Sequence, residues 1–416
     1  MMIQACTLDD PGSSNSITPL TLQADQNLSL TELNWNAVKV TGFREYIILQ
    51  STSEIPATPT PEVSANVTIL KRIDDADVTT FSTSSILFTP DVCYKLYVSI
   101  EDRFIQSSNI CVHQDFQLFN GFYDRAAHED GIDEMVMFDR VNQRLSSYNY
   151  KEGTITRTVN EIFLSFPILE LSKWEDNTSL FAYDQSPGVL RKYRYPELTS
   201  SMSKDFGGVL FAANFHNQFI VAAVEDFNGS LKVLSRSNLS VLDSKQGLLG
   251  NRNVAIFEGD PLIALDISDN EILRYNIDGS GKLTLIDTKS HGISQPNSQN
   301  AAANGTDLFI SGRLGTIVDR NGNIAGTLNS NPNETVWMAR FSEDERKVVY
   351  GINAGINLRL EIADISNLEN ITRLSTFNIP SANYSDMVVE DGIIYLTGVT
   401  FDSGQAQTFT LKYPMP

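Results

Sequence analysis

The residue types that most often carry out chemistry are few in this chain and widely separated. Its four histidines are His113, His128, His216 and His291, and no His-x-x-x-His, His-x-His or Cys-x-x-Cys spacing occurs. Zinc sites commonly use such spacings to take two ligands from one local segment. We therefore expect no metal site and no cofactor.

The strongest candidate for cation chemistry is the acidic turn His128–Glu134, H-E-D-G-I-D-E. It lacks the D-x-[DN]-x-[DN]-G order that arranges oxygen ligands around a calcium ion. The chain also lacks the G-x-S-x-G, G-x-G-x-x-G and Walker motifs, which position nucleophiles and phosphates. We interpret the turn as solvated, although paired carboxylates brought together by the fold could still act as acid and base.

A repeated strand unit must position whatever site exists. In Arg340–Tyr350, R-F-S-E-D-E-R-K-V-V-Y, a polar turn joins the end of one short strand to an apolar second strand. Variants recur along the chain, and the second strands begin near Met135, Leu180, Phe219, Leu262, Leu308, Val348 and Ile393. Their mean spacing of 43 residues is typical of four-stranded propeller blades. We predict an all-β fold with a seven-bladed β-propeller of four-stranded blades over residues 115–416.

The two ends of the repeat region are expected to close the ring. The tail after Ile393 supplies two or three strands and lacks the outermost strand of its blade. Asp115–Phe119, D-F-Q-L-F, is the candidate to fill that place by pairing near Gln407–Lys412. Such closure would remove an exposed sheet edge.

The pattern of residues 19–114 predicts a separate module of short strands. The motifs L-x-W at Trp35, Y-x-I at Tyr46, T-T-F at Phe81, C-Y-K-L-Y-V at Tyr94 and then S-S-N follow one another at strand spacing. Their order resembles that of a fibronectin type III domain. The resemblance implies a β-sandwich in which Trp35 and Tyr94 belong to the core.

Two of the three cysteines fall on the last two strands of this module. A hairpin turning near Asp102 and Arg103 would bring Cys93 and Cys111 within about one position of direct opposition, which is close enough for a disulfide. A disulfide fits an exported protein. Two buried thiols are the alternative.

The third cysteine lies near the N-terminus. Cys6 follows Ile3-Gln4-Ala5 and precedes the acidic pair Asp9-Asp10 and a Ser/Asn/Pro-rich stretch. This segment resembles the lipobox and surface-export signal of Bacteroidetes lipoproteins, and the whole chain looks like a Bacteroidetes-type surface lipoprotein. The resemblance implies a lipid on Cys6, a tether over residues 1–18 and a place at the outer-membrane surface or in the periplasm. An ordinary N-terminal segment with an unmodified cysteine is the alternative.

The charge of the chain limits its partners. Fifty-one acidic residues against 31 basic ones give a formal net charge of −20. Such a surface repels phosphate backbones, so nucleic acid is not an expected partner. The sequence holds no run of about 18 apolar residues, so we expect membrane contact only through the lipid anchor. We also expect a monomer.

The expected ligand site is the propeller face formed by two sets of loops. One set leads into the innermost strands, and the other joins the second and third strands. Candidate ligand-binding residues there are Arg140, Asp184, Asp226, Arg252, His291, Arg313, Trp337 and Tyr384. Trp337 is also explained as a core residue of an inner strand.

These features predict a non-catalytic cell-surface binding protein. Its propeller would bind a glycan, a peptide or a protein partner, with the N-terminal module as a spacer. Two alternatives stay open, because a fold does not by itself determine function. One is a propeller enzyme of lactonase-like or lyase type with a site in the central funnel. The other is a structural part of a surface assembly.

Overall fold

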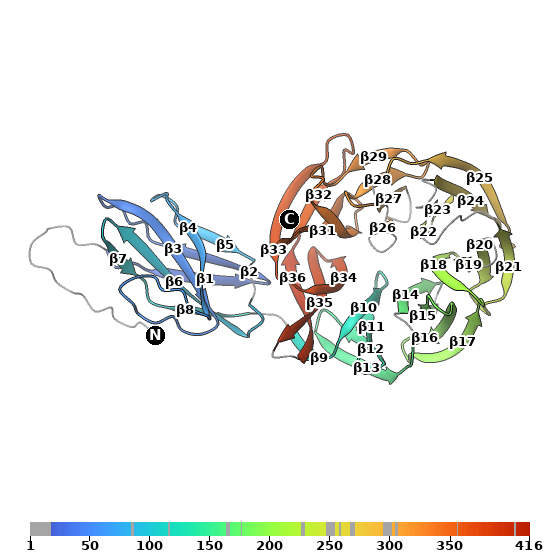
Figure 1. Cartoon of the computed structure of the whole chain (residues 1–416), viewed down its shortest axis with the longest axis horizontal. Coiled ribbons are helices and arrows are strands. Elements are labelled where there is room, and N and C mark those ends of the chain that lie inside the picture. Colours follow the sequence, from blue (N-terminus) through green and yellow to red (C-terminus); the bar gives the residue numbers. More distant parts are fainter. Residues whose placement is uncertain are drawn as a thin grey trace, which may run out of the picture. The chain divides into compact units, whose positions relative to one another are not determined.

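The computed structural model consists of β-strands joined by turns and loops (Figure 1). It describes residues 18–416 except 85–86, 115–116, 164–166, 176, 226–228, 247–253, 258, 267–270, 294–301, 304–306, 356 and 403–404. Cys6, the predicted lipidation site, lies outside this range. Within it, no helix is long and apolar enough to cross a membrane. The chain divides into two compact units, Met1–Phe116 and Gln117–Pro416.

The first unit contains two antiparallel sheets. One sheet has the order β1-β2-β5, and the other has the order β4-β3-β6-β7, with β8 also paired to β6. The strands are β1 (Leu22–Asn27), β2 (Leu30–Trp35), β3 (Phe43–Ser51), β4 (Val67–Ile73), β5 (Thr80–Thr83), β6 (Asp91–Ile100), β7 (Arg103–Gln106) and β8 (Ile110–His113).

The two sheets of this unit share one apolar core. Leu33 and Trp35 of β2 pack with Tyr46 of β3 and with Tyr94 and Leu96 of β6. The alternation of apolar and polar residues along β2 places its apolar side chains on the face that meets the other sheet. The structure joins Cys93 of β6 and Cys111 of β8 by a disulfide. The two residues lie directly opposite each other in the β6–β8 pairing.

The second unit is a ring of sheets. Its described strands form seven antiparallel sheets of four strands each, and the sheets are arranged around a central axis in a propeller-like way (Figure 1). The predicted all-β fold of repeated four-stranded sheets is confirmed. We call the sheets blades 1 to 7 in chain order. The first strand of each blade lies innermost and the fourth lies outermost.

The strand bounds follow the repeat along the chain. Blade 1 is β10 (Tyr123–His128), β11 (Glu134–Asp139), β12 (Arg144–Asn149) and β13 (Thr154–Asn160). Blade 2 is β14 (Pro167–Trp174), β15 (Asn177–Asp184), β16 (Val189–Arg194) and β17 (Thr199–Asp205). Blade 3 is β18 (Val209–His216), β19 (Phe219–Glu225), β20 (Ser230–Ser235) and β21 (Val241–Gln246). Blade 4 is β22 (Val254–Phe257), β23 (Leu262–Asp266), β24 (Glu271–Ile277) and β25 (Leu283–Ser290).

The remaining three blades follow in the same way. Blade 5 is β26 (Ala302–Ala303), β27 (Leu308–Ser311), β28 (Thr316–Asp319) and β29 (Ile324–Thr327). Blade 6 is β30 (Thr335–Phe341), β31 (Lys347–Ala354), β32 (Asn357–Asp364) and β33 (Thr372–Ile379). Blade 7 is β34 (Asn383–Glu390), β35 (Ile393–Asp402), β36 (Gln405–Pro414) and β9 (Gln117–Asn120).

Blade 7 joins the two ends of the ring. Strand β9 pairs antiparallel with β36, from Gln407 opposite Asn120 to Thr410 opposite Gln117. This is the pairing expected for the closing strand. Its first two predicted residues, 115 and 116, lie outside the described range. The hydroxyl of Tyr148 in blade 1 donates a 2.9 Å hydrogen bond to Thr410 Oγ1, so blade 1 also contacts the closed blade.

Candidate protein-interaction face

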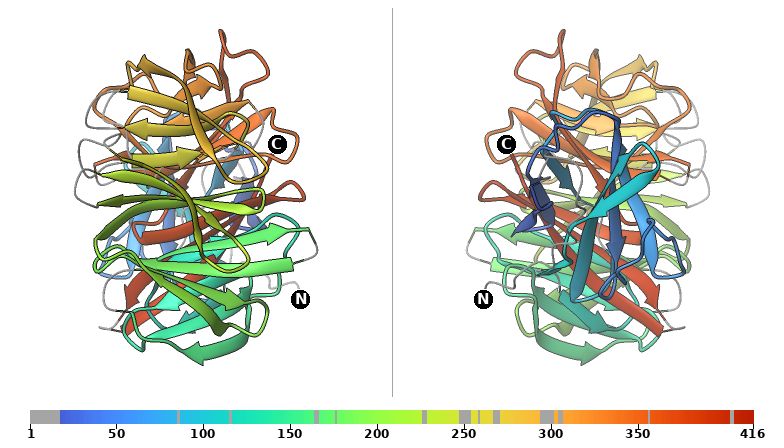
Figure 2. Two further views of the ribbon diagram at one scale, coloured as in Figure 1. Left: turned by 90° about the vertical axis from the view of Figure 1, so that its right-hand side faces the viewer. Right: turned by 90° about the vertical axis from the view of Figure 1, so that its left-hand side faces the viewer.

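The strand order of the blades sets which loops share a face of the ring. The strands run between the two faces of the ring (Figure 2). In each antiparallel blade the first strand therefore begins on the face where the second strand ends and the third begins. We call this the loop face. Arg140, Asp184, His291, Arg313, Trp337 and Tyr384 all lie at loop-face strand ends or in loop-face turns. Asp226 and Arg252 lie outside the described residues.

Trp337 and Tyr384, predicted separately, stack on each other across blades 6 and 7. Their ring centroids are 5.3 Å apart and their planes differ by 20°. Trp337 occupies a β-bulge, because the register of β30 shifts between Val336 and Met338. A Cβ atom at Gly351 of β31 would lie 2.3 Å from the Trp337 ring, so only glycine leaves room for it. The bulge turns the indole toward the neighbouring blade.

Packing explains most of this aromatic pair. Tyr384 also packs edge-on against Phe409, at 5.7 Å, and its hydroxyl donates a 2.6 Å hydrogen bond to the Pro380 carbonyl. Burial raises the pKa of Tyr384 well above its ordinary value. Trp337 Nε1 is buried and has no hydrogen-bond partner among the described residues. The pair therefore belongs to the contact between blades 6 and 7.

Three further predicted residues hold the loop-face segments in place. Asp184 is buried, and its Oδ2 lies 3.5 Å from the guanidinium of Arg191. Arg313 Nε donates to the Glu334 carbonyl and to Thr335 Oγ1, at 3.3 and 3.2 Å. His291 Nδ1 accepts a 3.2 Å hydrogen bond from the backbone N–H of Ile293. The side-chain contacts of these three residues orient loops and strand ends.

Arg140 leads to a surface that the sequence prediction did not include. Its guanidinium lies over the ring of Phe122, 4.5 Å from the centroid. Phe122, in the segment that leads into β10, packs in turn against Phe401 of the β35–β36 hairpin at 5.5 Å. Arg140 also pairs with Asp124 at 3.6 Å, and burial raises the pKa of that carboxyl. An arginine stacked on an aromatic ring keeps its donors while its flat face is covered.

The turn beside Arg140 is built by Asp139, the last residue of β11. Its buried carboxylate accepts hydrogen bonds from the backbone N–H groups of Val141 and Asn142 at 3.1 Å, and from Arg144 Nη2 at 2.7 Å. Burial acts to raise the pKa of Asp139. The hydrogen bonds from Asn142 and Arg144 outweigh burial, so its pKa lies below the ordinary value. Aspartate often closes turns in this way, and here the result leaves the side chain of Val141 70% exposed.

The neighbouring loop, between blades 1 and 2, presents a second apolar side chain. Ile162 is 72% exposed, and its carbonyl accepts a 3.0 Å hydrogen bond from Arg191 Nη1. Arg191 lies over the ring of Phe163, 4.8 Å from the centroid. Thus an exposed aliphatic side chain again lies beside an arginine that is stacked on phenylalanine.

Gln143 connects the two halves of this surface. Its side chain donates a 3.0 Å hydrogen bond to the Arg140 carbonyl and accepts one of 3.0 Å from the Phe163 N–H. Its backbone carbonyl accepts a 2.9 Å hydrogen bond from the Glu161 N–H. We call the continuous surface over blades 7, 1 and 2 the loop-face patch. Its members are Phe122, Arg140, Val141, Ile162, Arg191 and Phe401.

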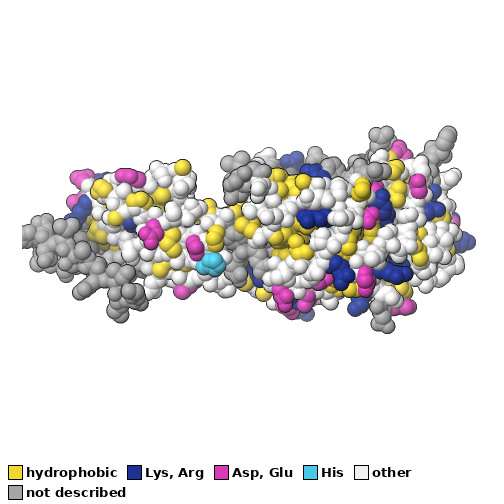
Figure 3. Space-filling view, turned by 90° about the horizontal axis from the view of Figure 1, so that it is seen from below, with side chains coloured by type: hydrophobic (Ala, Val, Ile, Leu, Met, Phe, Trp, Pro, Cys, Tyr) yellow, Lys and Arg dark blue, Asp and Glu magenta, His cyan; other side chains and the backbone are white. Residues whose placement is uncertain are grey.

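The loop-face patch combines exposed apolar side chains with arginines that lie over phenylalanine rings. Val141, Ile162 and Phe401 are 70, 72 and 61% exposed, although burying one such side chain contributes about 1.5–3 kcal/mol. Arginine and aromatic residues dominate the binding energy of many protein interfaces. On the side of the ring seen in Figure 3, acidic, basic and apolar side chains are mixed. The sequence signal for the patch was Val141, an apolar residue directly after the predicted candidate Arg140.

The described residues contain no group of three or more His, Cys, Asp or Glu side chains that could hold a metal ion. His128 and His216 are the last residues of their inner strands, β10 and β18, so His128 precedes the turn to which the sequence analysis assigned it. Burial lowers the pKa of both imidazoles. They lie at the ends of strands opposite the loop face.

Comparison with known proteins shows the fold alone. No family model matches the chain, and no curated protein matches it. Solved structures do match, 859 chains in all. One is a chain from "Crystal Structure of Mitotic Checkpoint Complex", with a TM-score of 0.51 and 12% identity, covering 71% of this chain and 91% of that chain. The shared arrangement supports a propeller-like fold.

Proposed function

We propose that this chain is a non-catalytic binding protein that contacts a protein or peptide partner through the loop-face patch. The observation that carries the proposal is the repeated arrangement at Val141 and Ile162. Each exposed aliphatic side chain stands beside an arginine fixed on a phenylalanine ring. A rigid apolar centre with charged donors at its side suits a protein surface better than a glycan. The fold neighbour from a protein complex is compatible with this role.

A catalytic role has less support from the same face. Three of the described carboxylates there are engaged in ion pairs: Asp184 with Arg191, Asp124 with Arg140, and Asp386 with Arg340 at 2.6 Å. A general base needs a carboxylate that can reach a substrate proton. We therefore favour a binding protein over an enzyme of lactonase-like or lyase type. We also favour it over a structural part of a surface assembly.

The proposal includes a location at the cell surface. It rests on the lipobox-like residues before Cys6 and on the acidic pair after it. In this reading the lipid on Cys6 anchors the chain at the cell envelope, and the fibronectin type III-like unit spaces the ring from the membrane. Expression behind an export signal should place the wild type in the membrane fraction, and Cys6→Ser should release it. Equal release of both forms would contradict the anchor.

Binding can be tested with the full chain on peptide, protein and glycan arrays. The variant Val141→Glu with Ile162→Glu places two carboxylates at the centre of the loop-face patch. The matched control is Ile324→Glu, because Ile324 is 52% exposed on the outer strand β29. We expect peptide or protein signals that the patch variant loses and the control keeps. Signals from glycans alone, or the absence of any peptide or protein signal that the patch variant loses, would overturn the proposal.

A further inference from the structure

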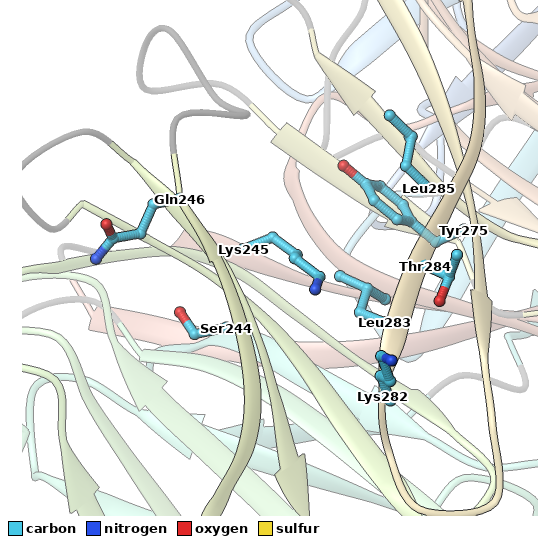
Figure 4. Close-up of a pocket in the computed structure, with 8 residues that line it drawn as sticks. All are labelled: Ser244, Lys245, Gln246, Tyr275, Lys282, Leu283, Thr284 and Leu285. Carbon is cyan, nitrogen blue, oxygen red and sulfur yellow. The ribbon is translucent and has the colours of Figure 1, made fainter.

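A groove lies on the rim of the ring, between the outer strands of blades 3 and 4. Its volume is about 590 Å³, within the range of roughly 300–1,000 Å³ that ligand sites occupy. Ser244, Lys245 and Gln246 of β21 form one wall, and Lys282, Leu283, Thr284 and Leu285 form the other. Tyr275 of β24 lies beside Leu285 at the second wall, and the side chain of Lys245 points across toward Leu283 (Figure 4). The groove is on the rim and is therefore separate from the loop-face patch.

Asp243 joins the two walls. Its Oδ2 accepts a 2.8 Å hydrogen bond from the Leu283 N–H, and its Oδ1 accepts one of 2.8 Å from the Ser244 N–H. Burial acts to raise the pKa of Asp243, but these hydrogen bonds and nearby Lys245 outweigh it, and the pKa lies below its ordinary value. The hydrogen bond between Asp243 of β21 and Leu283 of β25 links the outer strands of blades 3 and 4 across the groove. These hydrogen bonds also engage both oxygens of the Asp243 carboxylate.

The lining of the groove is cationic in an acidic chain. Lys245 and Lys282 line it, and none of the eight lining residues is acidic. Lys245 Nζ lies 3.4 Å from Asp243. Lys282 lies beside Asp278, whose Oδ1 accepts a 3.0 Å hydrogen bond from the Lys282 backbone N–H and whose carboxylate interacts electrostatically with Lys282. In a chain of net charge −20, two lysines that line one groove are a local source of positive charge, which Asp243 and Asp278 partly offset.

Apolar side chains flank the lysines. Leu242 and Ile286 are 44 and 50% exposed, next to Val241 and Leu285 at 41 and 42%. Leu242 and Ile286 are bulge residues, since the β20–β21 and β24–β25 pairings shift register beside them. A bulge turns an additional residue out of the alternating pattern. Each of the two outer strands therefore exposes two consecutive aliphatic side chains.

We propose that this groove binds an extended acidic peptide in which carboxylates and aliphatic side chains alternate. The carboxylates would pair with Lys245 and Lys282. The aliphatic side chains would cover the exposed leucines and isoleucine of β21 and β25. A small anion would leave that apolar surface uncovered. The two cations lie on different strands, which favours a ligand long enough to reach both.

The test uses the full chain and a fluorescein-labelled peptide of alternating Glu and Leu, followed by fluorescence anisotropy. A peptide with Gln in place of each Glu is the matched probe. We expect saturable binding of the acidic peptide that weakens at high salt. Lys245→Glu with Lys282→Glu should weaken it about tenfold or more. Lys204→Glu, on the outer strand β17 of blade 2, is the control and should leave it unchanged.

Several results would overturn the proposal. They are no saturable binding, equal binding of the Gln peptide, or affinity unchanged in the double lysine variant with an unaltered melting temperature. Tighter binding of a sulfated oligosaccharide that displaces the peptide would assign the groove to polyanionic glycans instead. The Val141→Glu, Ile162→Glu variant should bind the peptide normally. Loss of binding in that variant would place the peptide on the loop-face patch.

Discussion

Tyr150 of blade 1 donates a 2.6 Å hydrogen bond to Glu390 Oε2 of blade 7, across 240 residues of sequence. Lys151, the next residue, lies 3.0 Å from the same carboxylate and 2.9 and 3.0 Å from Asp133 and Asp391. Burial raises the pKa of Tyr150, and the neighbouring Glu390 raises it further, so the phenol stays protonated and remains a donor. This cluster fastens the first blade to the last one.

Removing the Tyr150 hydroxyl should therefore destabilise the ring. Tyr150→Phe leaves the buried ring in place and takes one donor from Glu390. Since hydrogen bonds to charged groups contribute about 1.5–3 kcal/mol, we expect the free energy of unfolding to fall by that amount. Urea denaturation followed by circular dichroism measures it.

Tyr413→Phe is the matched control for this experiment. Tyr413 is also fully buried, but its hydroxyl has no hydrogen-bond partner among the described residues. The control should be neutral or slightly stabilising, because it removes a buried polar atom that is not paired. Equal losses in the two variants would show that the Tyr150–Glu390 bond does not stabilise the closed ring.

The buried histidines predict a loss of stability in mild acid. Burial lowers the pKa of His128, although Asp386, Asp130 and Glu390 act in the opposite direction. Burial also lowers the pKa of His216. As the pH falls, the unfolded chain takes up protons on these groups near their ordinary pKa of about 6.5, before the folded chain does. Their contribution to stability is complete above that pH and is lost as the pH falls through the lower folded pKa.

Unfolding by urea at several pH values between about 7 and 5 tests this expectation. The double variant His128→Gln, His216→Gln should show a weaker decrease of the free energy of unfolding over this range than the wild type. His113→Gln is the control, because the side chain of His113 is 75% exposed. A pH profile unchanged in the double variant would contradict the assignment.

The repeat could be predicted from the sequence because strand pairing in each blade requires the same pattern of residues. Each blade needs a polar turn followed by an apolar second strand buried on both sides. The predicted markers accordingly fall in second strands, such as Leu180 in β15 and Val348 in β31. The closing strand was predictable for the same reason, since the tail was one strand short and Gln117–Asn120 supplied it.

The candidate surfaces were less predictable because they depend on single-residue register. Bulges turn Trp337 toward blade 7 and place Leu242 and Ile286 on the rim. Whether Arg140 points toward a ligand or lies over Phe122 depends on a contact between loops that sequence spacing does not encode. Val141 follows the predicted candidate Arg140, but its sequence position does not show whether its side chain is exposed. Its exposure results from the hydrogen bonds that Asp139 makes to the turn.

The disulfide of the first unit makes a separate prediction. Cys93 and Cys111 are 18 residues apart, and closing a loop of that size contributes about 3 kcal/mol by restricting the unfolded chain. Cys93→Ala with Cys111→Ala should lower the free energy of unfolding of the first unit by about that amount. The mass of the unreduced protein should rise by about two daltons on reduction, and the change should map to the peptides that contain Cys93 and Cys111. Two alkylatable thiols in the unreduced, unfolded chain would rule it out.

Closure of the ring makes the last prediction. Strand β9 fills the outer position of blade 7, and Phe119 packs against Tyr148 of blade 1 at 4.9 Å. Blades are stabilised mainly by their neighbours, so removing β9 should expose the edge of β36 and loosen blades 7 and 1 together. Deleting residues 1–114 spares β9 and should leave a folded ring. Deleting residues 1–121 removes β9, and the product should aggregate or melt at a markedly lower temperature.

The two truncations differ by seven residues, so they separate the role of β9 from that of the first unit. Hydrogen exchange adds a local measurement. In the longer truncation the amides of β36, from Gln407 to Thr410, lose their partners in β9 and should exchange faster than those of β31 in blade 6. If both truncations melt alike and β36 stays protected, β9 does not close the ring. If the shorter truncation also fails to fold, the ring depends on the first unit, and its stability cannot be attributed to the blades and their closure alone.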